Sequence, residues 1–495
     1  MSAAILTARK ASLQVAAWLG VLLAALFFGR LLIVMGPTLT FAFLAIIAIF
    51  LAVMARPAYG ALVLAAGVPI VSGMQRGFPI PALRPSEAII ALVASAVLLA
   101  TATRTDRVPW RTFDWLALLY AVGNLMLGSF DLIARGDPFS FDAIGELLGP
   151  FQFLLIYRAV MAAVTSEELR RRAIRLVMFA SVPVALLGIA QSLNLGPTRD
   201  IVAKLTGIDV STAYGYQAIP RATGPFPIWH ELGGYLFLVI LLGLALYLEP
   251  ESKLMSRRAL GFVLAIAGGG VIATATIAPI AGVFIGALVL GFWMRKLSKL
   301  VLGVAIGAMV LALLFSPLLT NRYDQQFGQG TVITHRPDYV PQTLWARYLI
   351  WTDQYIPALS KDERWFAGYG PGVPPEVDWP YTESLYITMV LRGGIILLAI
   401  YGCLMLALAQ RARAFTRSRD PTQRALARTV YLSVILLLFM HIVANYFVVS
   451  GFPHLFWPLL GLLFARVKPT QEPVRVESDE LRGAAGLPVP STAAS

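Results

Sequence analysis

Residues 228–248 read Ile-Trp-His-Glu-Leu-Gly-Gly-Tyr-Leu-Phe-Leu-Val-Ile-Leu-Leu-Gly-Leu-Ala-Leu-Tyr-Leu. A run of this length and apolarity can cross a hydrocarbon core of about 30 Å as a helix. Its polar groups, His230 and Glu231, both lie in what would be the first turn. The stretch therefore predicts a membrane-spanning helix with its polar side chains at one end.

Similar apolar runs recur along most of the chain. Of 495 residues, 58% are apolar and 14% charged, against about 45–50% and about 25% in an average soluble domain. This composition excludes a soluble globular domain and predicts an all-α polytopic membrane protein with roughly 12–14 transmembrane helices. We expect these helices at approximately residues 13–35, 38–54, 58–72, 86–102, 113–130, 146–163, 176–192, 228–248, 259–275, 277–294, 300–317, 384–410, 429–449 and 454–466.

The distribution of basic residues predicts the orientation of the spans. With the N-terminus in the cytoplasm, 26 of the 40 Lys and Arg residues fall on the cytoplasmic side, 11 on the opposite side and three within spans. Cytoplasmic loops of membrane proteins carry an excess of Lys and Arg. The net charge of +13 is therefore explained by topology, and we expect no nucleic-acid partner. These features predict a multi-pass protein of the bacterial inner membrane with both termini in the cytoplasm.

This topology divides the chain into six segments. Apolar sequence resumes directly after Arg30, so we expect an uncleaved first span instead of a signal peptide. Transmembrane helices are expected at residues 1–192, 228–317 and 384–466, periplasmic loops at 193–227 and 318–383, and a disordered cytoplasmic tail at 467–495. The larger loop is rich in aromatic residues and contains a potential amphipathic helix at 342–356, which could lie at the membrane interface.

Familiar catalytic motifs are missing from the sequence. It has no Walker loop, dinucleotide fingerprint, metal-ligand cluster or Ser-His-Asp pattern, and its single cysteine, Cys403, lies in an apolar run. Functional groups are therefore expected among the polar residues at the periplasmic face.

The first candidate group precedes residues 228–248. Arg221 could bind a phosphate with two parallel hydrogen bonds, or it could anchor the span to lipid headgroups. His230 and Glu231 lie just inside the apolar run, where polar groups are costly and usually functional. A structural role for His230 is an equally good interpretation.

The second and third candidates flank the end of the larger loop. Arg347 and Trp351 lie on the predicted amphipathic helix, and Gly368-Tyr-Gly370-Pro-Gly372 suits either close approach to a ligand or a series of turns.

Glu383 and Tyr386 stand at the start of the next span. Glu383 could act as a general base or cap the helix N-terminus. Arg392 lies about two turns further, where a central arginine costs about 2.5–3.5 kcal/mol, so it should face the protein interior or a wet cavity.

Together these elements resemble the O-antigen ligase and Wzy-type polysaccharide polymerase superfamily. The resemblance covers the order and spacing of elements over roughly residues 140–465. It consists of an Arg-x-x-Gly-x-aromatic motif before a span, a large late loop with Arg-x-x-x-Trp and Gly-x-Gly, and a polar pair opening the following span, at Arg221, Gly224, Phe226, Arg347, Trp351, Gly368, Gly370 and Glu383-Ser384.

The resemblance implies a membrane glycosyltransferase of the GT-C type without metal or cofactor. Such enzymes transfer a glycan from an undecaprenyl diphosphate carrier to an acceptor at the outer face of the inner membrane. Arg221 and Arg347 match the arginines that hold the diphosphate. Glu383-Ser384 stands where ligases have a His-Asn pair, which argues against a ligase and for a polymerase. Thr274-Ala-Thr276 replaces a Ser-Arg pair of many members, and Arg392 is a candidate for the missing charge.

We therefore expect a polymerase that joins undecaprenyl-diphosphate-linked oligosaccharide repeat units into exopolysaccharide, capsule or O-antigen. The expected catalytic residues are Arg221, Arg347 and Glu383, and the expected substrate-binding residues are His230, Glu231, Trp351, Tyr386 and Arg392. Besides the lipid-linked glycan, membrane lipids and the chain-length regulator and flippase of the pathway are expected partners. Alternatives are an O-antigen ligase, an enzyme of protein-linked glycan transfer, and, from a different class, a secondary transporter or lipid flippase.

Overall fold

The computed structural model describes residues 30, 40–77, 83–102, 108–136, 138–208, 221–328, 336–361, 364–379, 381–448 and 450–467. The predicted first span, apart from Arg30, and the predicted tail beyond residue 467 lie outside the described residues. All regular elements in the described ranges are helices, and no strand occurs among them. The chain is an all-α polytopic membrane protein, as the sequence predicts.

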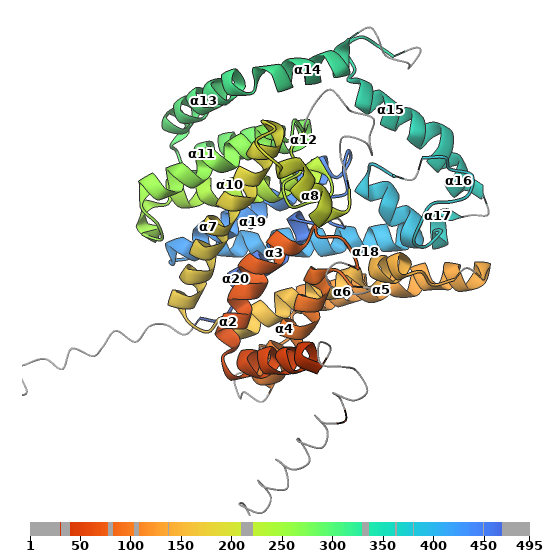
Figure 1. Ribbon diagram of the computed structural model, residues 1–495, viewed down its shortest axis with the longest axis horizontal. Helices are drawn as coiled ribbons and strands as arrows, with labels where there is room; N and C mark the ends of the chain where they lie inside the picture. The colour runs from red at the N-terminus through yellow and green to blue at the C-terminus, as the bar shows by residue number, and fades with distance from the viewer. Residues whose placement is uncertain are drawn as a thin grey trace, which may run out of the picture.

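Seven of the described helices are long and apolar enough to cross a membrane. They are α4 (Pro85–Ala102), α5 (Thr112–Arg135), α6 (Phe141–Ala163), α7 (Glu167–Ser192), α10 (Trp229–Leu248), α18 (Leu385–Phe415) and α19 (Pro421–Met440). Shorter or more marginal apolar helices complete the bundle: α11 (Arg257–Ala273), α12 (Ile277–Trp293), α13 (Leu297–Leu314) and α20 (Phe452–Phe464) (Figure 1). The expected 12–14 spans thus include several that are short or broken.

The helices nearest the N-terminus show one such break. The spans expected at 38–54 and 58–72 form a pair, Thr40–Ala55 and Pro57–Val71, bent by 106°. The second half comprises α2 (Pro57–Leu62), a π-helical turn (Val63–Gly67) and α3 (Val68–Val71). Each half is only about 24 Å long, so the pair counts as at most one span. Pro57 explains the bend, because proline cannot continue a preceding helix.

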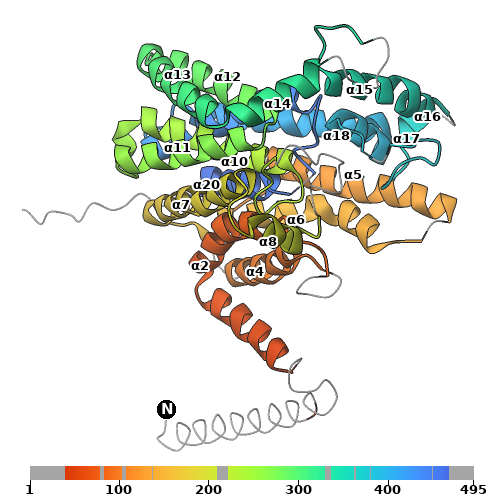
Figure 2. The same cartoon turned by 45° about the horizontal axis from the view of Figure 1, so that its top comes forward.

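Helix α10 lies in the interior, in contact with α7, α11, α12, α19 and α20 (Figures 1 and 2). It is apolar on all sides, which suits a buried helix. Small residues let its neighbours approach closely. A Cβ atom at Gly234 would lie 2.7 Å from Cδ1 of Tyr446. The absence of a side chain at Gly234 therefore leaves the space that the segment after α19 occupies.

Helix α18 is broken at Gly393 and Gly394. Gly394 has φ +65° and ψ −169°, which is outside the helical region. A Cβ there would lie 1.9 Å from the carbonyl oxygen of Phe366, in α17 (Arg364–Ala367). The span expected at 384–410 is therefore a short helix before the break and a longer one, of about 32 Å, after it.

Helix α19 does not match the span expected at 429–449. It begins at Pro421, where the Asp420 side chain accepts a hydrogen bond from Thr422 N, and it ends at Met440. The described residues from 441 to 451 are irregular. The expectation of a helix up to residue 449 was wrong, because the polar residues of this part bond to other elements instead of continuing the helix.

The larger loop forms an arch of helices along the outside of the bundle (Figures 1 and 2). It contains α14 (Ser316–Phe327), α15 (Gln342–Ile350), a π-helical turn (Trp351–Tyr355) and α16 (Ile356–Ser360). A helix over 342–356 was predicted and is confirmed. The π-helical turn shifts its register, so Tyr355 is buried while Leu344 and Tyr348 are exposed.

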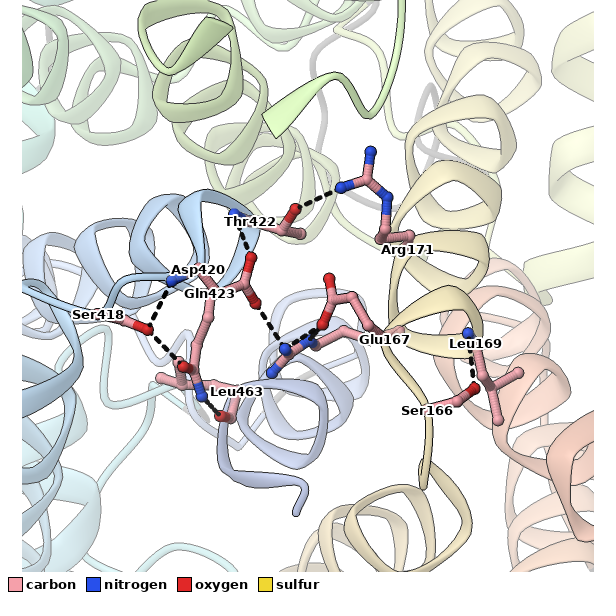
Figure 3. Close-up of polar contacts among 10 residues, drawn as sticks. Ser166, Glu167, Leu169, Arg171, Ser418, Asp420, Thr422, Gln423 and Leu463 are labelled. Carbon is pink, nitrogen blue, oxygen red and sulfur yellow. Dashed lines mark hydrogen bonds and ion pairs between the residues drawn. The ribbon is translucent and has the colours of Figure 1, made fainter. Parts of the chain in front are cut away.

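Charged groups tie the helices together at the end of the bundle where α7 and α19 begin. Arg170 of α7 is buried and pairs with Glu167 and with Asp420, whose Oδ2 lies 2.6 Å from Nη2. Figure 3 shows these contacts, together with the bond from Gln423 Nε2 to Leu463 O at the end of α20. At the same end, Arg424 and Arg428 of α19 both bond Glu249, directly after α10. We call this the clamped end.

Candidate functional site

At the other end of the bundle, polar groups from distant parts of the sequence converge. His230 interacts electrostatically with Glu383, Arg347 and Arg221, and so does Tyr446. The rings of His230 and Tyr446 meet edge to face with centroids 6.0 Å apart. We call these five residues the polar cluster. Four of them were expected as site residues. Arg221 and His230 lie just before and at the start of α10, Glu383 lies just before α18, Arg347 is on α15, and Tyr446 follows α19.

Arg221 holds the break between α11 and α12. Its side chain is buried, and it donates from Nε to Thr274 O at 2.9 Å and from Nη2 to Ala275 O at 3.2 Å and Thr276 Oγ1 at 2.9 Å. Its guanidinium carbon also lies 3.9 Å from the ring centroid of Trp229. Arg221 thus donates hydrogen bonds to carbonyl groups that have no helical donor where α11 ends and α12 begins.

The loop that carries Arg221 is itself fixed by α7. Gln191 Oε1 accepts hydrogen bonds from Thr223 N at 2.8 Å and Gly224 N at 3.0 Å. Gly224 has φ +56°, a left-handed conformation that glycine adopts without strain. The glycine of the Arg-x-x-Gly motif is therefore required by the turn.

Arg347 and Glu383 form an ion pair. Arg347 donates to Glu383 Oε2 from Nη2 at 2.8 Å and from Nε at 3.2 Å. The two side chains are 24% and 28% exposed. The residues expected to bind phosphate and to accept a proton thus contact each other, and solvent reaches both.

The backbone around Glu383 is fixed on both sides. Trp351 Nε1 donates to Thr382 O at 2.8 Å, and Leu385 N donates to His441 O at 3.0 Å. Glu383 itself has φ +55°, which is unfavourable for a residue with a Cβ and is often found at functional sites. The N-cap residue of α18 is Ser384, and the carboxylate of Glu383 bonds Arg347, so the structure does not support the interpretation of Glu383 as a helix cap.

Two expected substrate-binding residues lie away from the polar cluster. Glu231 is 4% exposed, its electrostatic neighbours are Arg84 and Ser450, and its Oε2 has no hydrogen-bond partner among the described residues. Arg392 bonds Glu146 Oε2 at 2.9 Å, and only 14% of its side chain is exposed. It faces α6, so its charge is satisfied there.

The remaining expected groups have structural contacts. Tyr386 OH donates to Leu438 O at 2.5 Å. Gly368 and Gly370 have φ values of +82° and +85°, and Gly370 N donates to Leu391 O at 3.0 Å, directly before the break in α18. The glycine-rich sequence therefore forms turns that pack against this break.

Three polar residues of the site were not predicted, because they fell within the expected span 429–449. They are His441, Asn445 and Tyr446. Asn445 Nδ2 donates to Thr382 Oγ1 at 2.9 Å and His441 Nδ1 bonds Tyr401 OH at 2.8 Å. Asn445 Oδ1, His441 Nε2 and Tyr446 OH are buried without a hydrogen-bond partner among the described residues. Their position within an apolar run was the available signal, since intramembrane polar groups are costly.

An apolar groove runs along the bundle. It has a volume of about 590 Å³ and lies between α12 and α19. One end is lined by Ala278 and Val443, which are close in sequence to Thr276 and Asn445, and the other by Trp293 and Tyr431. From Ala278 to Trp293 the helix extends about 22 Å, so the groove covers much of the depth of a membrane.

No group of three or more His, Cys, Asp and Glu residues in the described part of the chain could hold a metal ion. Neither the family models nor the curated proteins contain a match to this chain.

Proposed function

We propose that this protein is a membrane glycosyltransferase that joins lipid-diphosphate-linked oligosaccharide units into a polymer. The observation that carries the proposal is that one end of a long apolar groove, at Ala278 and Val443, is close in sequence to Thr276, which Arg221 bonds, and to Tyr446 of the polar cluster. A polyprenyl chain suits the groove, and its diphosphate would then lie beside the cluster, where Arg347 can bind it. Placement of the cluster at the periplasmic face of a bacterial inner membrane is part of the proposal and follows from the basic-residue distribution.

The reaction requires two kinds of group. The acceptor hydroxyl attacks the anomeric carbon, the bond from that carbon to the diphosphate breaks, and the hydroxyl proton passes to a base. Fixed cations stabilise the charge that develops on the leaving diphosphate, and Arg347 is suited to this. Glu383 is the proposed base, with His230 as the next candidate because it belongs to the same cluster. Arg221 acts by holding the α11–α12 break near the diphosphate.

The structure offers one observation in favour of another class. Breaks in α18 and between α11 and α12 lie close to polar groups, as in many secondary transporters. Transporter sites usually lie near the middle of the membrane between two related halves, whereas this polar cluster lies at the helix ends and no internal repeat is visible in the sequence. We therefore favour the transferase. An O-antigen ligase would share the site and differ in the acceptor.

The test is turnover of lipid-linked repeat units by the purified protein, read as a ladder of product lengths. A transporter would give no ladder, and a ligase would give product only with lipid A core as acceptor. The groove is tested with Ala281→Trp, which should narrow it and raise the KM for the lipid-linked substrate. Phe284→Trp, on an exposed part of α12 outside the groove, is the matched control. Equal kinetics for both variants would contradict the assignment of the groove.

A further inference from the structure

Arg347 uses its two-pronged edge to bind Glu383. Nε and Nη2 both donate to the same oxygen, Oε2. This edge is one of the two on a guanidinium that can bind a carboxylate or a phosphate through two parallel hydrogen bonds, and on the other edge Nη1 already donates to Thr343 O at 3.3 Å. A phosphate oxygen therefore cannot use the first edge while Glu383 remains in place.

We infer that Glu383 occupies the anion site of Arg347 and is displaced by the diphosphate of the lipid-linked substrate. The inference rests on the proposed function. Glu383 then lowers the affinity of Arg347 for every anion by the same factor, because each anion must compete with a carboxylate already held there. A diphosphate carries more negative charge than a monophosphate or carboxylate, so it competes best.

The surrounding contacts allow the side chain to leave without moving the backbone. Thr382 is held by Trp351 and Asn445, and Leu385 is held by His441. The carboxylate, in contrast, is partly exposed, and its hydrogen bonds among the described residues are those to Arg347. Rotation about the side-chain bonds is therefore sufficient to free Arg347.

Displacement also links substrate binding to the chemistry. In the ion pair, Arg347 holds the carboxylate through Oε2 and fixes its direction, so that neither oxygen can turn toward a substrate hydroxyl elsewhere in the site. Once the diphosphate has replaced the carboxylate, Glu383 can accept the proton of the acceptor. The base is thus released only when a donor substrate is bound.

The experiment measures binding of inorganic pyrophosphate and orthophosphate to the purified full-length protein by calorimetry. Glu383→Gln should bind pyrophosphate about fivefold more tightly than wild type, which corresponds to loss of an ion pair worth about 1 kcal/mol. Its gain for orthophosphate should be similar, because the competing carboxylate lowers the affinity for both anions by the same factor. Arg347→Gln should lose this binding. Glu376→Gln is the matched control, because it removes a negative charge from an exposed pair with Lys361 in the same segment.

Glu383→Gly provides a second variant, since glycine suits the left-handed backbone, and it should show the same gain. Unchanged or weaker pyrophosphate binding in the folded Glu383 variants, with Arg347-dependent binding in wild type, would overturn the inference and leave the proposed function intact. Absence of Arg347-dependent binding in folded wild type would overturn both the inference and the diphosphate site of the proposed function.

Discussion

Replacing Arg221 with alanine should destabilise the protein. Arg221 donates three hydrogen bonds to the α11–α12 break and stacks on Trp229. Its removal leaves two buried carbonyl groups without these donors, at about 1–3 kcal/mol each, and loses a cation–π contact of about 1–2 kcal/mol. Allowing for partial relaxation, we expect a loss of about 3–5 kcal/mol in the free energy of unfolding.

The measurement is thermal unfolding of the purified protein, followed by tryptophan fluorescence. Arg221→Lys should be intermediate, because an ammonium group cannot reproduce the fork of donors. Arg172→Ala serves as control, since Arg172 is 56% exposed and, within the part of the chain that the structure describes, pairs only with Glu168 on the same helix. An Arg221→Ala protein that unfolds at the wild-type temperature but has lost pyrophosphate binding would refute this reasoning and would make Arg221 a direct ligand of the substrate.

Three further predictions concern stability. Arg170→Gln should cost about 1–3 kcal/mol, because it leaves the partly exposed carboxylates of Glu167 and Asp420 at the clamped end without their cation, and unchanged thermal unfolding would contradict this role. Gly394→Ala should unfold at a much lower temperature than wild type, because its Cβ would meet Phe366 O, whereas Gly402→Ala on the same helix, which has open space, should be neutral or gain up to about 1 kcal/mol. If both variants unfold alike, the break in α18 is not required. Burial alone would raise the pKa of Glu249. The hydrogen bonds and positive charges of Arg424 and, to a smaller extent, Arg428 have the larger opposite effect and hold this pKa below its ordinary value. The stabilisation by Glu249 is therefore complete above the pKa of the unfolded chain, about 4.3, and is lost as the pH falls through the lower pKa of the folded protein. The stability difference between wild type and Glu249→Gln should shrink between about pH 6 and about pH 3, and a constant difference would argue against this ion pair.

Part of the site could be predicted from residue type and position. His230 at the start of an apolar run, Arg347 near the middle of an aromatic-rich loop and Glu383 at its end were expected as site residues, and the fold places all three in one cluster. The basis was the cost of polar groups in a membrane, which makes such positions informative without an alignment. The same reasoning predicted Arg392 as a buried charge but could not identify Glu146 as its partner, since the two are far apart in the sequence.

Contacts between distant segments could not be predicted. The sequence does not reveal that Arg221 bonds Thr274 and Ala275, or that Arg347 and Glu383 bond each other. It also placed His441, Asn445 and Tyr446 in a helix, because an apolar run continues past the true end of α19. In these cases a local pattern allows more than one conformation, and the choice depends on which partners the rest of the chain supplies.

The sequence by itself determined the class of the protein and the approximate position of most spans. This follows because an apolar run must form a helix to satisfy its backbone in a membrane, whatever its neighbours are. The tertiary structure alone decided the angle of the bend at Pro57, the break in α18 at Gly394 and which charges are paired. These features depend on hydrogen bonds and ion pairs between segments that are distant in the chain, and such energies are defined only once the helices are packed.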